Sequence, residues 1–409
     1  MEATDLAILA AVGLVYVIVS ARLARTILTS AIVFLTAGIV LGSAALGLFT
    51  IGPNAATLRL IAEATLALVL FTDASRVDLR TLRRELAVPV RLLVIGLPLT
   101  IVAGVAAALV TLPELTLVEA SLLAIAVAPT DAALGAAVVS DERVPSRIRQ
   151  GLNVESGLND GLCVPLLLVA LAFVSAEAGR EAEPIQLVLE EIVFGVVGGV
   201  VAGGLGALAL RWARQHDWVA SVWAPVAPLM IVGLAYGLAT VLHGSGLIAT
   251  FVAGLAFGMI LSKADEETAG VAETLGSAMS AFTFLIFGAT VVPVTLAELT
   301  WQPIIFAVLA LTVVRMLPVA VALLGLGARL PTLGFLAWFG PRGLASIVFA
   351  VLILQSGSIP HLDLILAAIT VTIVISVYAH GITALPLTNR YVAWAAANPR
   401  HALHTGGDA

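Results

Sequence analysis

Apolar residues fill long continuous runs of this chain, and short polar segments separate the runs. About thirteen runs approach the roughly 20 residues that an α-helix needs to cross a bilayer. We place them at residues 6–19, 27–48, 58–71, 87–112, 117–139, 151–174, 185–210, 219–242, 247–261, 275–296, 304–326, 333–354 and 362–387. The pattern predicts an all-α polytopic membrane protein whose single transmembrane domain spans residues 1–390. Residues 391–409 are expected to form a short disordered tail.

The composition agrees with a membrane domain. Of the 409 residues, 60% are hydrophobic and 11% are charged, whereas a soluble domain carries about 25% charged residues. The single cysteine, Cys163, excludes an internal disulfide. The chain shows no glycine-rich phosphate loop, so neither nucleotide nor nucleic acid is expected as a partner. No basic region precedes the first run, which is therefore predicted to be a retained span.

Basic residues mark alternate loops and so predict the orientation. One set of loops and the tail hold Arg22, Arg25, Arg76, Arg80, Arg83, Arg84, Arg143, Arg147, Arg149, Arg211, Arg214, Lys263, Arg329, Arg390 and Arg400. The opposite set holds only Arg59 and Arg180. By the positive-inside rule the N-terminus lies outside and the C-terminus in the cytoplasm.

Two segments of the chain resemble two others at one offset of 216 residues. Residues 35–42 align with 251–258, and residues 68–71 align with 284–287. An odd number of spans separates the partners, so the two halves would run in opposite directions across the membrane. This predicts two inverted six-helix repeats, as in many secondary transporters. Repeat one covers about 6–174, a connector helix about 185–210, and repeat two about 219–387.

Corresponding spans of the two repeats, the fifth and the twelfth, each contain a proline beside polar groups. Pro129 precedes Thr130 and Asp131, and Pro341 precedes Arg342. Proline removes an amide donor and interrupts a helix, and paired interruptions are the best sequence pointer to a transporter's binding site. We expect two crossed broken helices, with freed carbonyls that bind a cation and half-helix dipoles neutralised by Asp131 and Arg342.

The sixth span carries the densest group of polar residues. Asn153, Ser156 and Asp160 share one helix face at i, i+3 and i+7, and Glu155 with Asn159 forms the adjoining stripe. Asp160 lies near the bilayer midplane, where an ionised carboxylate costs on the order of 3 kcal/mol or more. Such residues normally mark an ion or proton path.

Arg342 is an intramembrane cation that needs an anionic partner, and Glu155, Asp131 and Asp160 are the candidates. We expect the structural ion pair to be Glu155 with Arg342, which leaves Asp160 to exchange its ion. The alternative is one static network of all four charges. Three acids against one arginine would leave that network an excess of negative charge.

Three further polar residues are given structural roles. Glu63 is expected to pair with Arg91 or Arg315. His243 and His380 are placed near span ends, where histidine commonly forms interfacial hydrogen bonds.

Asn159 bears on the charge carried in each transport cycle. A second acid beside Asp160 would carry a second proton, whereas an amide does not. If Asp160 alone alternates between one proton and one monovalent cation, the exchange is one for one and electroneutral.

Several motifs together resemble the prokaryotic sodium/proton antiporters of the NhaP type, in the electroneutral branch of the cation/proton antiporters. They are Leu70-Phe71-Thr72-Asp73-Ala74 with the loop 77–80, Ala128-Pro129-Thr130-Asp131, Glu155-Ser156-Gly157-Leu158-Asn159-Asp160-Gly161, His243-Gly244-Ser245-Gly246 and Gly340-Pro341-Arg342-Gly343. The resemblance runs from about the first span to the thirteenth.

The resemblance implies roles for individual residues. Asp160 would bind Na⁺ or a proton competitively, with Ser156, Thr130 and Asp131 as further Na⁺ ligands, direct or through water. Asn159 would mark the electroneutral branch and steady the crossed helices. The Glu155–Arg342 salt bridge would lie within the moving part.

Members of this family are homodimers in which a six-helix core moves like an elevator beside a scaffold at the dimer interface. The expected function is therefore secondary antiport of a monovalent cation, Na⁺ first, against H⁺ in the plasma membrane, without cofactors and without enzymatic activity. The alternatives are a K⁺/H⁺ antiporter of the same superfamily, a sodium/solute symporter of the same general fold, and a passive cation channel.

Overall fold

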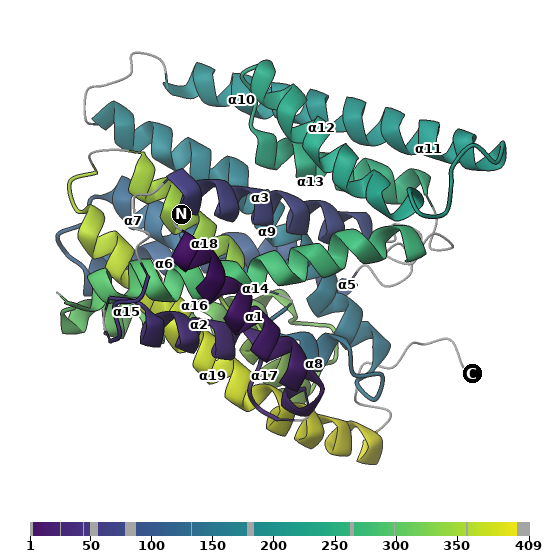
Figure 1. The fold of residues 1–409 in the computed structure, drawn as a ribbon. Helices are drawn as coiled ribbons and strands as arrows, with labels where there is room; N and C mark the ends of the chain where they lie inside the picture. Colours follow the sequence, from purple (N-terminus) through teal and green to yellow (C-terminus); the bar gives the residue numbers. More distant parts are fainter. Residues whose placement is uncertain are drawn as a thin grey trace. The chain divides into compact units, whose positions relative to one another are not determined.

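A computed structural model describes residues 3–24, 26–43, 45–49, 56–77, 87–131, 133–177, 184–261, 266–297, 299–356 and 359–398. In that part of the chain, every regular element is a helix, as Figure 1 shows. The described residues do not include 399–409 of the expected tail, residues 78–80 of the quoted motif, or the basic residues Arg25, Arg80, Arg83, Arg84, Arg180, Lys263 and Arg400.

The helices coincide with the apolar runs. Those of the first half are α1 (Ala3–Leu23), α2 (Ser30–Leu41), α3 (Ala56–Ser75), α5 (Ala87–Arg91), the π-helical turn η1 (Leu92–Gly96), α6 (Leu97–Thr111), α7 (Leu117–Ala126), α8 (Ala136–Val139) and α9 (Ser146–Glu177). The helix α10 (Pro184–Gly199), the π-helical turn η2 (Val200–Leu205) and α11 (Gly206–Gln215) follow in the region of the expected connector.

The second half continues in the same way. It contains a 3₁₀ turn η3 (Ala224–Val226), α12 (Ala227–Val241), α13 (Gly246–Ile260), α14 (Glu266–Ala297), α15 (Trp301–Leu311), α16 (Val313–Ala322), α17 (Leu330–Trp338), α18 (Leu344–Gln355) and α19 (Leu362–Ala397). The last helix therefore reaches into the segment expected to be a disordered tail.

Eight helices or helical groups among the described residues are long and apolar enough to cross a membrane. They span Ala3–Leu23, Ala87–Thr111, Ser146–Ser175, Gln186–Gln215, Ala224–Val241, Gly270–Ala297, Trp301–Ala322 and Leu362–Ala397. Shorter apolar helices include α2, α7, α13 and α18. Large apolar side chains such as Leu14, Ile18 and Val110 are exposed on these helices, which is typical of a surface that faces lipid.

The chain divides into two compact units. The first contains Met1–Arg59, Glu85–Asn159 and Ala281–Ala409, and the second contains Leu60–Arg84 and Asp160–Ser280. Boundaries fall inside α3, α9 and α14, so each of these helices contributes to both units. Within the first unit α6 packs on α7, and α15 packs on α19. Within the second unit α10, α12 and α13 pack on one another, as Figure 1 also shows.

A close backbone contact occurs inside each unit at a glycine. In the first unit Gly38 of α2 lies so near Leu285 of α14 that a Cβ there would overlap the Leu285 carbonyl. In the second unit Gly254 of α13 lies equally close to the carbonyl of Phe71 in α3. Only glycine permits such an approach of two helices.

Helix α7, which leads to the candidate site, is defined at its start by a capping box. Thr116 accepts from the Glu119 amide, and Glu119 accepts from the Thr116 amide. Glu119 also accepts hydrogen bonds from the backbone and ring of His361, just before α19. This arrangement joins the first turn of α7 to the first turn of α19.

Candidate functional site

Two helices are interrupted near Pro129 and Pro341, as the sequence predicts. Helix α7 ends at Ala126, and the residues around Pro129 have no regular secondary structure before α8 begins. Helix α17 ends at Trp338, and residues 339–343, which include Pro341, have no regular secondary structure before α18 begins. Each interruption leaves backbone groups without helical partners.

The two irregular segments are hydrogen-bonded to each other. The Asp131 amide donates to the Pro341 carbonyl at 2.8 Å. The Leu344 amide, which opens α18, donates to Asp131 Oδ2 at 2.9 Å. Ser346 Oγ in turn donates to the Ala126 carbonyl at the end of α7, at 2.8 Å. Each broken helix thus supplies the partners that the other lacks.

Asp131 is buried at the positive end of the half-helix α18. Its Oδ2 accepts from the start of α18, and its Oδ1 accepts from the amides of Ala133 and Leu134, in the turn before α8, at 2.8 and 3.3 Å. A carboxylate at this place opposes the dipole of α18, as the sequence predicts. The backbone of Gly343 approaches so closely that a Cβ there would overlap the Asp131 carboxylate.

Thr130, Ser156 and Asn159 form one buried hydrogen-bonded cluster. Asn159 Oδ1 accepts from the Thr130 amide at 3.2 Å, and its Nδ2 donates to Thr130 Oγ1 at 2.7 Å. A peptide N–H only donates, so it orients the side-chain amide of Asn159. Thr130 Oγ1 lies 3.0 Å from Ser156 Oγ. Helix α9 is therefore attached to the interruption of α7 at this point.

Asp160 is the next residue of α9, and it is also buried. It lies four residues after Ser156, so the two side chains occupy the same helix face one turn apart. A carboxylate and two hydroxyl groups are oxygen ligands, which suit a hard cation. Among the described residues, no group of three or more His, Cys, Asp or Glu side chains is placed to hold a metal ion.

Glu155 is paired with Arg315, which corrects the expectation that Arg342 would be its partner. Both terminal nitrogens of the Arg315 guanidinium, Nη1 and Nη2, donate to the carboxylate, and Nη2 lies 2.9 Å from Glu155 Oε2. Both side chains are buried. Arg315 follows an interruption at Thr312, where α15 ends and α16 begins. The sequence shows Arg315 as an intramembrane cation but does not show which acid it faces.

Arg342 is also buried, and its guanidinium turns to a backbone oxygen. Its Nη1 donates to the Gly340 carbonyl at 2.9 Å. Gly340 is the second residue after the end of α17, where the helix dipole is negative. The cation is thus placed at the half-helix end that the sequence predicts.

Glu63, Ser376 and His380 form contacts that were not predicted from the sequence. Glu63 accepts from Tyr236 Oη at 2.5 Å within the second unit. His380 is buried midway along α19, and Ser376 accepts from the Arg342 amide at 2.6 Å. A run of 36 helical residues places His380 far from a helix end, whereas the shorter predicted span placed it near one.

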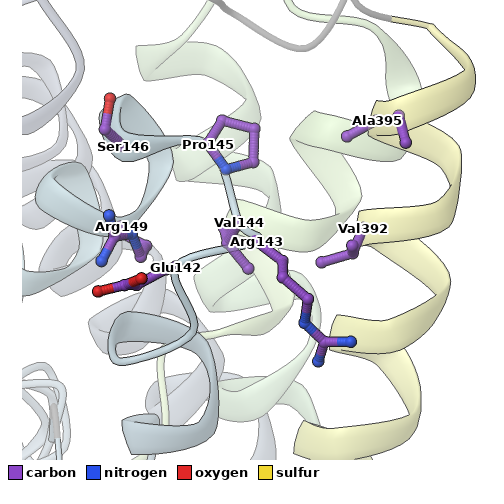
Figure 2. A pocket seen from close by; sticks show the side chains of 9 residues that line it. Glu142, Arg143, Val144, Pro145, Ser146, Arg149, Val392 and Ala395 are labelled. Carbon is purple, nitrogen blue, oxygen red and sulfur yellow. The ribbon is translucent and has the colours of Figure 1, made fainter.

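A surface pocket of about 520 Å³ lies where the chain enters α9. Figure 2 shows it between the loop 142–146 and α19, with Arg143, Arg149 and Val392 on its lining. Arg143 is bound to Asp141, and its Nη2 donates to Asn389 of α19 at 3.0 Å. The pocket contains none of the predicted site residues, and Arg143 holds the loop against α19.

Comparison with known proteins identifies the family of this chain. A family model described as "Sodium/hydrogen exchanger, transmembrane" matches residues 8–390. A Na(+)/H(+) antiporter of Schizosaccharomyces pombe is 29% identical over 270 residues, which cover 62% of this chain and 57% of that protein. The K(+)/H(+) antiporter NhaP of Alkalimonas amylolytica is 25% identical over 395 residues, which cover 95% of this chain and 67% of that protein.

A solved structure has the same fold. The structure of the sodium proton antiporter MjNhaP1 from Methanocaldococcus jannaschii at pH 8 matches with a TM-score of 0.74 and 19% identity, and the match covers 92% of this chain and 98% of that chain. The chain spans between about half and two thirds of the length of the two curated relatives described above.

Proposed function

Since the chain belongs to the family of transmembrane sodium/hydrogen exchangers, we propose that it exchanges a monovalent cation, Na⁺ first, for a proton across the membrane. The observation that carries this proposal is the buried oxygen cluster beside the hydrogen-bonded interruptions of two helices, directly before Asp160 in α9. Such a cluster suits a small cation, and a neighbouring carboxylate suits a proton.

Asp160 carries the exchange by binding either ion but not both. A bound proton neutralises the carboxylate and removes its attraction for Na⁺, while a bound Na⁺ opposes protonation. Ser156 and Thr130 supply further oxygen ligands from α9 and from the interruption of α7. The loaded site is neutral in both forms, and crossing of a neutral site is far cheaper than crossing of a bare charge.

Asp131 supports the site through the backbone and contributes to cation binding through water. Three backbone amides already donate to its two oxygens. These bonds would weaken if the carboxylate moved to contact Na⁺ directly. We therefore assign Asp160, Ser156 and Thr130 as the direct ligands.

Asn159 makes the exchange one for one. Its amide fastens Thr130 in place and takes up no proton, so only Asp160 changes its protonation state. One proton then moves against one monovalent cation, and no net charge crosses the membrane. The buried pair of Glu155 and Arg315 holds α9 against α16.

The proposed architecture has thirteen spans in two inverted repeats. The reciprocal contacts at Gly38 and Gly254 support it, because α2 of one repeat contacts α14 of the other and α13 contacts α3. The N-terminus would lie outside and the C-terminus in the cytoplasm of a cell with this protein in its plasma membrane. A homodimer in which a core moves beside a scaffold provides alternating access.

Asp160→Asn tests the central assignment. The purified variant is placed in liposomes with an internal pH dye, and proton flux is recorded after a Na⁺ gradient is imposed. We expect coupled flux to be lost while folded protein is recovered in normal amount. Asp217→Asn is the matched control, because Asp217 is exposed and its positive φ of 56° is one that asparagine tolerates. Full exchange by Asp160→Asn would refute the role of Asp160.

The same assay identifies the ion. Gradients of Na⁺, Li⁺ and K⁺ are imposed in turn, with and without a voltage clamp by valinomycin and K⁺. Selective response to K⁺ would keep the mechanism and change the cation, as the K⁺/H⁺ relative suggests. Cation uptake without proton flux would favour a sodium/solute symporter instead.

A further inference from the structure

His380 is buried midway along α19, behind the interruption between α17 and α18. Its Nε2 lies 3.1 Å from the Trp338 carbonyl, at the last residue of α17. Its Nδ1 lies 3.1 Å from Ser376 Oγ and 3.0 Å from the Ser376 carbonyl. The Trp338 ring packs on the imidazole with 4.9 Å between the ring centroids. The ring is therefore enclosed by polar groups from two helices.

Each ring nitrogen faces a backbone carbonyl, that of Trp338 at Nε2 and that of Ser376 at Nδ1, and a neutral ring donates to only one of them. When Nε2 carries the hydrogen, it donates to the Trp338 carbonyl. The Arg342 amide donates to Ser376 Oγ at 2.6 Å, which leaves the serine hydroxyl hydrogen for Nδ1. With a neutral ring, donors and acceptors form one continuous chain from Arg342 through Ser376 and His380 to Trp338.

Both ends of this chain are backbone groups at the broken helix. The Trp338 carbonyl is at the end of α17, and the Arg342 amide precedes α18. A regular helix would satisfy such groups internally, and buried backbone groups without partners destabilise a folded protein. Ser376 is the partner of the Arg342 amide, and His380 adds a second hydrogen bond to the Trp338 carbonyl, which also accepts from the Gly340 amide at 2.8 Å.

We propose that His380 is a positioning residue for the cation site: with Ser376 it holds the interrupted segment 338–342 in place, and thereby sets the position of Thr130. The proposal rests on the proposed function, since cation affinity is the quantity it affects.

Two hydrogen-bonded steps connect His380 with the proposed ligands. The held segment includes Pro341, whose carbonyl accepts from the Asp131 amide at 2.8 Å. Asp131 follows Thr130 directly, and Thr130 is bonded to Asn159 and lies beside Ser156. A shift of the segment around Pro341 therefore moves a hydroxyl ligand relative to α9.

The test compares three variants of this network in liposomes. His380→Leu removes both hydrogen bonds, Ser376→Ala removes the connection to Arg342, and His380→Gln keeps one donor and one acceptor but takes up no proton at neutral pH. His216→Gln is the control, because His216 is exposed at the end of α11. Apparent KM for Na⁺, maximal rate and the pH profile are measured per folded molecule.

We expect His380→Leu to raise the apparent KM by about tenfold, because the ring's hydrogen bonds to Ser376 and Trp338 are lost. Ser376→Ala should raise it by a smaller factor, and His380→Gln should stay within about twofold of the unmodified protein and keep its pH profile. The maximal rate should change less than KM in each variant.

Two results would overturn the proposal. If His380→Gln were as impaired as His380→Leu, the ring would act through its proton and not through position. If His380→Leu lowered only the yield of folded protein and left KM unchanged, its role would be structural alone. Failure of the proposed function would look different, because the unmodified protein itself would then show no proton flux coupled to a cation gradient.

Discussion

Asn159 and Thr130 are joined by two hydrogen bonds, one through the backbone amide of Thr130 and one through its hydroxyl. The first bond orients the side-chain amide, and the second uses Thr130 Oγ1 as an acceptor. A single residue of α9 thus holds the interruption of α7 and also determines that no second acid stands beside Asp160.

Asn159→Asp should change the stoichiometry while preserving most of the geometry. A carboxylate still accepts from the Thr130 amide, and the Thr130 hydroxyl can rotate to donate to it. The variant gains a second group that binds a proton, so its exchange should become sensitive to membrane voltage. Proton flux in liposomes with the valinomycin clamp measures this. Exchange that stays independent of voltage would contradict the role given to the amide.

Removing one partner of the Glu155–Arg315 pair should destabilise the protein strongly. Arg315→Gln leaves a buried carboxylate uncompensated, which costs about 3–5 kcal/mol. The double variant with Glu155→Gln should lose less than the two single variants added together. Thermal unfolding in detergent provides the comparison.

The matched control for this pair is Arg76→Gln. Arg76 contacts Glu273 at an exposed position of the second unit, where an ion pair contributes about 0–1 kcal/mol. If the buried and the exposed variant unfolded at the same temperature, the Glu155–Arg315 pair would not be the stabilising contact described here.

Gly343→Ala should impair exchange because a Cβ at that position overlaps the Asp131 carboxylate. Moving Asp131 from the start of α18 removes a charge-assisted hydrogen bond of about 1.5–3 kcal/mol, so exchange should fall by about tenfold or more. Gly334→Ala in α17 is the control, since nothing lies within 4 Å of a Cβ there. Equal rates for the two variants would show that the approach of Gly343 to Asp131 is unimportant.

The loop before α9 offers a test of pH dependence outside the membrane spans. Hydrogen bonds from the Arg143 guanidinium hold the pKa of Asp141 below its ordinary value of 3.8, despite partial burial. A lowered folded-state pKa adds stability above the unfolded value, and this stability is lost as the pH falls through the folded value.

Asp141→Asn should therefore be less stable than the unmodified protein by a constant amount from about pH 7 to about pH 4, and the difference should shrink only at lower pH. Thermal midpoints across this range provide the measurement, with Glu142→Gln as the control. A difference that disappears between about pH 7 and pH 5 would show that another group is responsible.

Individual residues show how far the sequence predicts the site. The interruptions at Pro129 and Pro341 follow from the missing amide donors, and helical spacing alone places Ser156 and Asp160 on one face. The partner of Glu155 depends on tertiary packing, because the interruption at Thr312 involves neither proline nor glycine. The position of His380 depends on the length of α19, which no local pattern determines.

The contact between Gly38 and Leu285 also has a consequence for biosynthesis. Gly38 of α2 packs against Leu285, which the ribosome adds about 250 residues later. At 5–20 residues per second this interval lasts roughly 10–50 s. Helix α2 is therefore inserted into the membrane long before Leu285 is synthesised. During that time lipid or another protein covers the face of α2 that contains Gly38.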